Sequence, residues 1–217
     1  MLSQLHTNIR PLLEYVVSAF ADSHHVCEVL KNTIRNRVLS ARRSMSSEER
    51  QQADGMLLVA LAEHLAAASG TGPLTIAGYL PMRAEPGGAG LPDLLLDHSR
   101  GGRLLLPHLR EDRDLDWYAR PGPAAHLLGV EAIGQADLVV VPAVAVDRTG
   151  IRLGRGGGSY DRALARVRPE VEVIALLYPG ELVDELPALA HDQPVSSTLV
   201  VDDRATRWTR TGRMPHH

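Results

Sequence analysis

Residues 137–178 read DLVVVPAVAVDRTGIRLGRGGGSYDRALARVRPEVEVIALLY. Asp137 to Pro142 and Val171 to Tyr178 are near-continuous apolar runs, which are typical of parallel strands covered on both faces. Ser159 to Arg168 lies between them and is expected to form a helix. The stretch therefore predicts a strand, a loop, a helix and a second strand, the unit from which α/β folds are built.

The rest of the chain extends this pattern. Further buried strands are expected at residues 74–80, 103–106 and 199–201, with a short helix at 91–98. Two helices come first, because residues 28–45 carry an apolar stripe at helical spacing and Ser46-Ser47-Glu48-Glu49 is a capping-box pattern that opens a second helix. We expect a single three-layer α/β/α domain with a central, mostly parallel sheet, preceded by an N-terminal helical hairpin.

The domain is expected to span residues 28–203, between a flexible N-terminal extension at 1–27 and a C-terminal tail at 204–217. The apolar run from Leu12 to Ala21 has some character of a secretory signal, but Glu14 interrupts it. The protein is therefore expected to be cytoplasmic.

Composition excludes several classes of function. The 217 residues carry 23 Lys and Arg against 26 Asp and Glu, whereas a general nucleic-acid binder has a basic excess. Cys27 is the single cysteine, which excludes an intrachain disulfide and a multi-cysteine zinc site. No apolar run reaches the roughly 18–20 residues that span a membrane. We expect a monomer that binds a small molecule, with neither nucleic acid nor a membrane as partner.

The glycine-rich segment is the densest chemical signal. Four glycines fall within residues 154–158, after an expected strand and before an expected helix. Glycines let backbone N–H groups approach a ligand closely, and Arg152 and Arg155 add charge and forked donors. A flexible turn is the alternative, but the context favours a phosphate-binding loop. The loop is not a Walker A motif, since it contains no lysine, nor a Rossmann fingerprint, since it lies late in the chain.

Asp161 lies one turn into the helix that follows. A carboxylate there would repel phosphates unless a cation intervened, and Mg²⁺ favours one or two carboxylates together with phosphate oxygens. The alternative is a carboxylate that only interacts with the helix dipole. Asp192 could supply a second ligand, although spacing alone favours an exposed turn residue.

Lys31, the only lysine of the chain, forms a row with Arg35 and Arg42 beside the apolar stripe of the first helix. Solvated surface charge is the usual explanation of such a row. However, the row borders the buried face of the helix, where charged side chains can point into a cleft.

The loop after the strand at 74–80 lies where α/β proteins bind ligands, and Glu85 there could accept hydrogen bonds from a substrate. Trp117 and Tyr118 could stack on a substrate ring or pack a loop over the core.

The segments LKNTIRNRVLSARRSMSSEER, AGYLPMRAEP and GIRLGRGGGSYDRAL, with the flanking ADLVVVPAVAVDRTG and VIALLYPGELVDELPALAHDQPV, resemble the 5-formyltetrahydrofolate cyclo-ligase family, the methenyltetrahydrofolate synthetases. The motifs occur in the family's order and cover residues 28–203. The resemblance implies an α/β ligase of one-carbon metabolism. It would use ATP and Mg²⁺ to convert 5-formyltetrahydrofolate to 5,10-methenyltetrahydrofolate, with release of ADP and phosphate.

The resemblance also implies roles for individual residues, with Lys31 and Arg155 as the catalytic pair and Asp161 and Asp192 as the Mg²⁺ ligands. Substrate contacts are expected from Arg35, Leu80, Glu85 and Tyr160. Trp117 is added to them because its ring could stack on the substrate. The expected ATP-binding residues are Lys31, Asn32, Thr33, Ile34, Arg35, Arg152, Leu153, Gly154, Arg155, Gly156, Gly157, Gly158, Ser159 and Tyr160.

One position departs from the family pattern. Many relatives carry an aromatic residue where this chain has Ser159, which predicts weaker folate stacking with catalysis retained. Two alternatives remain open at this stage: a non-catalytic reduced-folate-binding or regulatory module of the same fold, and a sugar-phosphate isomerase-like α/β enzyme that uses the anion loop without ATP.

Overall fold

The computed structural model describes residues 24–67, 70–82, 84–202 and 205–211. Its N-terminal part forms α2 (His24–Ser44), α3 (Ser47–Ala67), β1 (Thr75–Ala77), α4 (Leu91–Asp97), β2 (Arg103–Leu109) and β3 (Leu115–Arg120). Its C-terminal part forms the 3₁₀-helix η2 (Val130–Gln135), β4 (Leu138–Val141), β5 (Ala145–Asp147), β6 (Arg152–Leu153), α5 (Ser159–Leu164), β7 (Glu172–Leu177), β8 (Leu182–Val183), β9 (Ser197–Asp202) and β10 (Ala205–Arg210).

The main sheet has seven strands in the order β10-β9-β7-β4-β1-β2-β3. The five inner strands run parallel, and in register Val139 of β4 lies opposite Ala77 of β1 and Val173 of β7. The two edge strands, β3 and β10, pair antiparallel with their neighbours. Neither edge strand is predicted by the sequence: β3 contains Trp117 and Tyr118, which are expected in a loop, and β10 falls within the expected C-terminal tail.

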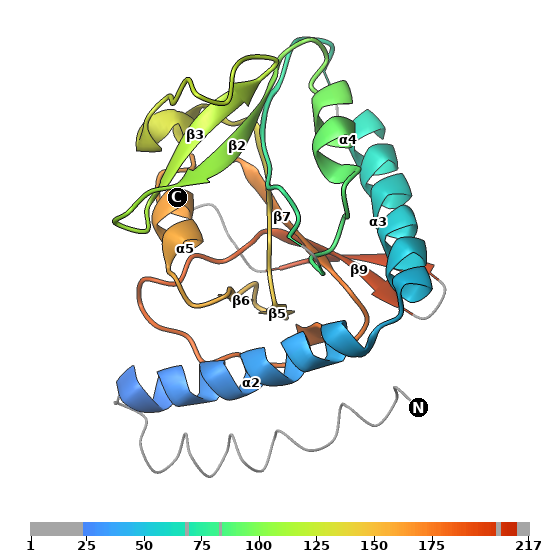
Figure 1. The fold of residues 1–217 in the computed structure, drawn as a ribbon, viewed down its shortest axis with the longest axis vertical. Coiled ribbons are helices and arrows are strands. Elements are labelled where there is room, and N and C mark those ends of the chain that lie inside the picture. Colours follow the sequence, from blue (N-terminus) through green and yellow to red (C-terminus); the bar gives the residue numbers. More distant parts are fainter. Residues whose placement is uncertain (1–23, 68–69, 83, 203–204, 212–217) are drawn as a thin grey trace.

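Both faces of the sheet are buried, which explains the continuous apolar runs. Val139 packs with Leu164 of α5 on one face. Its neighbour Val140 points to the other face and packs with Leu61 of α3 and Leu95 of α4. Helices therefore lie on both sides of the sheet (Figure 1), and the expected three-layer α/β/α arrangement is confirmed.

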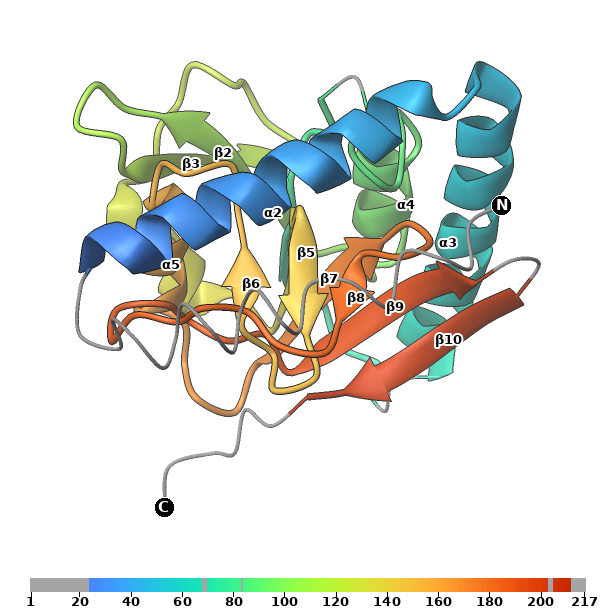
Figure 2. The same cartoon turned by 90° about the horizontal axis from the view of Figure 1, so that it is seen from below.

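The second helix of the N-terminal pair begins where the sequence indicates. Glu49 Oε2 accepts a hydrogen bond from the Ser46 backbone N–H at 2.7 Å, and Ser46 Oγ accepts one from the Glu49 N–H at 3.1 Å, which confirms the capping box. From this turn α3 runs along the main sheet. In contrast, α2 lies across a small second sheet, in the order β6-β5-β8 (Figure 2).

Several boundaries differ from the sequence expectation. α2 begins at His24, four residues before the expected domain start, and α5 is only six residues long. The expectations for residues 1–23 and 212–217, and for Arg83, fall outside the described residues. Of the helices in the described part of the chain, none combines the length and apolar character needed to cross a bilayer.

Candidate active site

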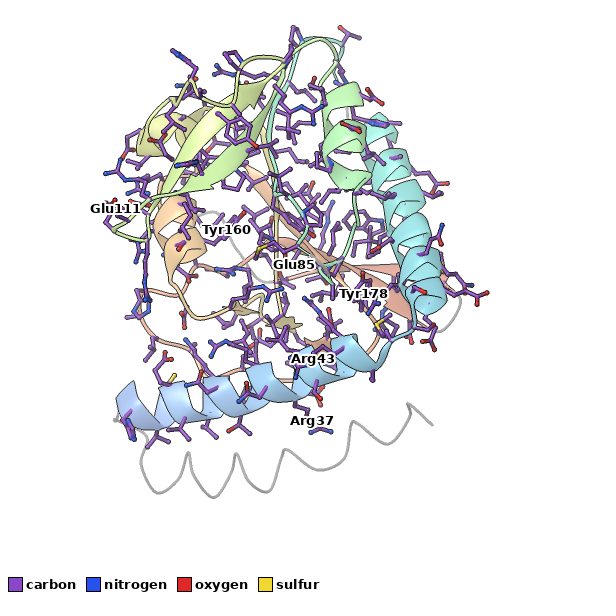
Figure 3. The ribbon with its side chains drawn as sticks, in the orientation of Figure 1. Arg37, Arg43, Glu85, Glu111, Tyr160 and Tyr178 are labelled. Carbon is purple, nitrogen blue, oxygen red and sulfur yellow. The ribbon has the colours of Figure 1, made fainter. Side chains whose placement is uncertain are left out.

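A cavity of about 720 Å³ lies between α2, the loop after β1, the glycine-rich loop and α5. Its volume is typical of a site for a small molecule or cofactor. Figure 3 shows Glu85 and Tyr160 in the middle of the molecule above α2, while Arg37 projects from the opposite side of that helix. One end of the cavity is charged and the other is apolar.

The glycine-rich loop forms one wall of the charged end. It leads into α5 as predicted, but the strand before it is β6, a short strand of the small sheet that the sequence did not predict. Its backbone has φ of +103° at Gly156 and +65° at Gly158, values that favour glycine. A Cβ on Gly156 would lie 3.5 Å from the Arg35 guanidinium, so the loop rests directly on α2. Because α5 is short, the charge at this end comes mainly from side chains and less from a helix dipole.

The basic row on α2 faces the interior. Lys31, Arg35 and Arg42 are only 6%, 8% and 2% exposed, so the usual explanation of solvated surface charge does not apply. Lys31 and Arg35 line the cavity. Arg42 instead forms a buried ion pair, donating from Nε and Nη2 to the Glu181 carboxylate at 2.6 and 2.8 Å.

Three pairs of opposite charges lie at the charged end; two of them join segments that are distant in sequence, and the third joins the two sides of the glycine-rich loop. The pairs are Lys31 Nζ with Asp192 Oδ2 at 2.6 Å, Arg152 Nη2 with Asp161 Oδ1 at 2.9 Å, and Arg155 Nε with Glu85 Oε1 at 2.7 Å. Each cation is thereby held in place next to the glycine-rich loop.

Arg35 is held differently from the other cavity cations. Its described hydrogen bonds go to neutral acceptors, the Gly154 carbonyl oxygen at 2.8 Å and the Asn32 side-chain oxygen. Burial lowers the pKa of its guanidinium below the usual value. The site therefore contains a desolvated cation whose charge an anionic ligand would neutralise.

Asp161 and Asp192 both line the cavity, on adjoining segments. The Gln193 backbone N–H, next to Asp192, donates to Asp161 Oδ1 at 3.3 Å. The described hydrogen bonds use Oδ1 of Asp161 and Oδ2 of Asp192, so one oxygen of each carboxylate has no hydrogen-bond partner among the described residues. The described residues contain no cluster of three or more His, Cys, Asp or Glu side chains that could hold a metal ion. These two carboxylates fit Mg²⁺ only with oxygens from a ligand.

The apolar end has walls from two strands and the loop after β1. Leu80 and Met82 follow β1, Leu109 ends β2 and Leu115 begins β3, and all four line the cavity. Tyr160 stands between the two ends, with its ring centroid 5.7 Å from the Arg152 guanidinium carbon. Burial raises the pKa of its phenol, which stays neutral at physiological pH.

Some predicted residues are not brought to the cavity. Trp117 is 0% exposed and packs in the sheet core on the α5 side, which corrects the expectation that it contacts substrate. On β3 it is Leu115, two residues earlier on the same face, that reaches the cavity. Asn32 and Thr33 lie on the exposed side of α2, and Ile34 is buried in a small core cluster. A helix turns about 100° per residue, so five consecutive residues cannot all face one ligand.

The cavity also includes residues that the sequence did not single out. They include Glu28, Tyr79, Pro107, Leu109, Leu115 and His191. Pro107 and Leu109 could have been found, because they lie at the carboxyl end of β2 and such ends meet at one edge of a parallel sheet. Leu115 could not, since its strand runs antiparallel at the edge.

Fold and cavity together define an α/β domain that binds a small molecule, with a glycine-rich loop and paired charges at one end of the site. A family model described as the 5-formyltetrahydrofolate cyclo-ligase family matches residues 28–201. The chain therefore belongs to the 5-formyltetrahydrofolate cyclo-ligase family, which is a family of ligases.

Individual relatives agree with this assignment. The 5-formyltetrahydrofolate cyclo-ligase of Mycolicibacterium smegmatis is 42% identical over 142 residues, which cover 58% of this chain and 72% of that protein. The structure of a 5,10-methenyltetrahydrofolate synthetase from Aquifex aeolicus matches with a TM-score of 0.63 and 28% identity, over 87% of this chain and 97% of that one. One from Mycoplasma pneumoniae matches the fold with a TM-score of 0.64 and 22% identity, over 80% of this chain and 98% of that one.

Proposed function

We propose that this protein is a 5-formyltetrahydrofolate cyclo-ligase that converts 5-formyltetrahydrofolate to 5,10-methenyltetrahydrofolate and releases ADP and phosphate from ATP. The observation that carries the proposal is the two-ended cavity. A glycine-rich loop packed on Arg35 forms its charged end, and apolar side chains from the loop after β1 and from β2 and β3 form the other.

The charged end suits a triphosphate. Lys31 and Arg35 of α2 and Arg152 of β6 converge with the glycine-rich loop on one side of the cavity. Arg35, which has no hydrogen-bonded carboxylate among the described residues, would bind phosphate without first losing an ion pair to any of them. Lys31 would exchange its contact with Asp192 for a phosphate oxygen, or share the two.

Asp161 and Asp192 would hold Mg²⁺ together with phosphate oxygens of the nucleotide. Mg²⁺ bound there would neutralise charge that develops on the transferred phosphoryl group. Arg152 and Lys31 restrain the same two carboxylates, which keeps them oriented toward the cavity when no cation is bound.

The apolar end suits the reduced pterin. Leu80 and Met82 offer apolar contact, and Glu85 could accept hydrogen bonds from ring N–H groups. One Glu85 oxygen accepts from the Met82 backbone N–H at 2.9 Å, which fixes the carboxylate within its loop. Ser159 offers no ring to stack on, so we expect Tyr160 to carry the aromatic contact.

The chemistry follows from this placement. A formamide oxygen is a poor leaving group, so it first attacks the γ-phosphorus of ATP, and the bond to ADP breaks. N10 then adds to the activated carbon, the carbon–oxygen bond breaks with departure of phosphate, and the N10 proton is released. Such phosphoryl transfer depends on positioning and charge neutralisation. Lys31 and Arg155 would supply the charge, and no protein nucleophile is needed.

The proposal is tested by mixing the protein with 5-formyltetrahydrofolate, ATP and Mg²⁺ and recording the near-ultraviolet absorbance of methenyltetrahydrofolate. We expect product only when ATP is present. Folate binding without turnover would indicate a binding module. If ATP with Mg²⁺ does not raise the melting temperature and folate does not bind, the proposed function is wrong.

A further inference from the structure

Two side chains, those of Tyr79 and Asp54, hydrogen-bond the backbone of the loop that carries Glu85, and a third, that of Tyr178, lies against it. The Tyr79 hydroxyl donates to the Pro86 carbonyl oxygen at 2.5 Å. The Gly87 N–H donates to Asp54 Oδ1 at 2.8 Å. The Tyr178 hydroxyl oxygen lies 3.4 Å from the Glu85 carbonyl oxygen. The backbone of residues 85, 86 and 87 is thus contacted at each position by a side chain from a different part of the chain.

Two of these three side chains, those of Tyr178 and Asp54, are hydrogen-bonded to each other. Tyr178, just past the end of β7, places its hydroxyl oxygen 2.8 Å from Asp54 Oδ1. A phenol has one hydrogen to donate, and it goes to this carboxylate, which is the nearer acceptor. Asp54 on α3 therefore accepts from both Tyr178 and Gly87, and it connects α3, the end of β7 and the loop.

The loop is shaped to approach Asp54 closely. Gly87 and Gly88 have φ of +96° and +53°, in the region that favours glycine. A Cβ on Gly88 would lie 2.8 Å from Asp54 Oδ2, closer than real side chains come. This close approach, independent of the hydrogen bonds, indicates that the loop rests on the carboxylate.

We infer that Asp54 and Tyr178 are positioning residues that set the place of Glu85 in the substrate half of the cavity. The inference rests on the proposed function, since it assigns Glu85 to the folate. Neither Asp54 nor Tyr178 lines the cavity, so they act through the loop and not on the substrate. Tyr178 also lies under Arg42, whose guanidinium carbon is 5.7 Å from its ring centroid, and Arg42 belongs to the helix that carries Lys31.

The first test compares Tyr178→Phe with wild type. This variant keeps the buried ring and removes only the hydroxyl, so it should fold. We expect the KM for 5-formyltetrahydrofolate to rise by about three- to tenfold, the effect of losing about one hydrogen bond, while the KM for ATP stays within about twofold. Asp54→Ala should show the same split more strongly, and Asp54→Asn, which keeps an acceptor, should recover part of the loss.

The control is His64→Ala, a second substitution on α3. His64 Nε2 lies 3.0 Å from Glu172 Oε2, and its ring stacks on Trp208, so its loss also loosens α3 from the sheet. It lies ten residues, about 15 Å along the helix, from Asp54. This variant should lower the melting temperature and leave both KM values unchanged.

Hydrogen exchange in the ligand-free protein gives a readout that needs no turnover. The amides of Ala84, Glu85, Gly87 and Gly88 should exchange faster in Tyr178→Phe than in wild type, and those of β4 should not. The inference is overturned if a folded Tyr178→Phe keeps the wild-type folate KM, or if the KM values for folate and ATP rise together. If wild type itself makes no methenyltetrahydrofolate, the proposed function fails and this assignment fails with it.

Discussion

Arg155 Nε lies 2.7 Å from Glu85 Oε1, so one ion pair joins the glycine-rich loop before α5 to the loop after β1. The two partners differ in exposure: the Glu85 side chain is 6% exposed and that of Arg155 is 45% exposed. In the proposed function Arg155 binds the phosphates of ATP and Glu85 binds the folate. Each substrate would therefore weaken this ion pair, ATP by binding Arg155 and folate by binding Glu85.

Glu85→Gln tests that relationship. The amide keeps the size of the side chain but loses the charge, so folate should bind about tenfold more weakly, as expected for a lost charge-assisted hydrogen bond. ATP binding should stay the same or tighten by less than about fivefold, because an exposed arginine in an ion pair is worth up to about 1 kcal/mol. Calorimetric titration with each ligand measures both effects. Markedly weaker ATP binding in this variant would contradict the proposed division of roles.

Asp161→Asn should weaken binding of Mg²⁺ with ATP. The variant also leaves the buried Arg152 without its carboxylate partner, which should lower stability by about 1–3 kcal/mol. A Mg²⁺ titration of the rate separates the two effects, since excess Mg²⁺ restores a metal defect and not a folding defect. Asp184→Asn, which removes an exposed carboxylate paired with Arg148, serves as the control. Wild-type activity at limiting Mg²⁺ would remove Asp161 from the metal site.

Lys31→Arg keeps the charge of the only lysine but changes its reach and donor geometry. Its pair with Asp192 is 2.6 Å long and both side chains are 7% exposed, so a larger guanidinium has little room. We expect kcat to fall by about tenfold or more, as is typical when a positioned group is displaced. Arg43→Lys, at an exposed position on the same helix, should leave kcat unchanged. A variant with wild-type kcat and ATP KM would show that Lys31 is not required as lysine.

Arg42→Leu should destabilise the protein strongly. Arg42 and Glu181 are 2% and 3% exposed, so the substitution leaves a buried carboxylate without its partner. Loss of one member of a buried pair costs about 3–5 kcal/mol, which urea unfolding can measure. Arg148→Leu breaks an exposed pair with Asp184 and should stay within about 0.5 kcal/mol of wild type. Equal effects of the two substitutions would refute a structural role for the buried pair.

Acid stability should depend on Asp114, next to β3. Hydrogen bonds from Arg166 hold the pKa of its carboxyl below the usual value. A carboxyl with a lowered pKa in the folded state stabilises the fold above the unfolded pKa of about 3.9, and this contribution is lost as the pH falls through the folded pKa. Asp114→Asn should therefore cost about 1 kcal/mol at pH 7 and almost nothing near pH 2. A cost that does not change with pH would contradict this origin.

Local sequence predicted the elements that are buried on both faces. The runs that became β4 and β7 are apolar at successive positions because helices cover both sides of the sheet. The capping box and the helix after the glycine-rich loop were also correct, because each depends on a few neighbouring residues; the short strands β5 and β6 before that loop were not predicted. The edge strands β3 and β10 escaped prediction, since half-exposed strands carry no such continuous run. Trp117 was therefore assigned to a loop and to the substrate, although strand alternation turns it into the core.

The sequence by itself determined which charges are available near the glycine-rich loop, and with the family resemblance it indicated the reaction. Only the tertiary structure decided which charges meet. Lys31 and Asp192 are 161 positions apart, and Arg155 and Glu85 are 70 apart. Periodicity within a helix or strand reports whether a side chain is buried, because burial depends on one face of one element. Which charged side chain a residue meets across the cavity depends on strand order, because that order brings the carboxyl ends of β1 and β4 together with α2. No local sequence pattern encodes the strand order.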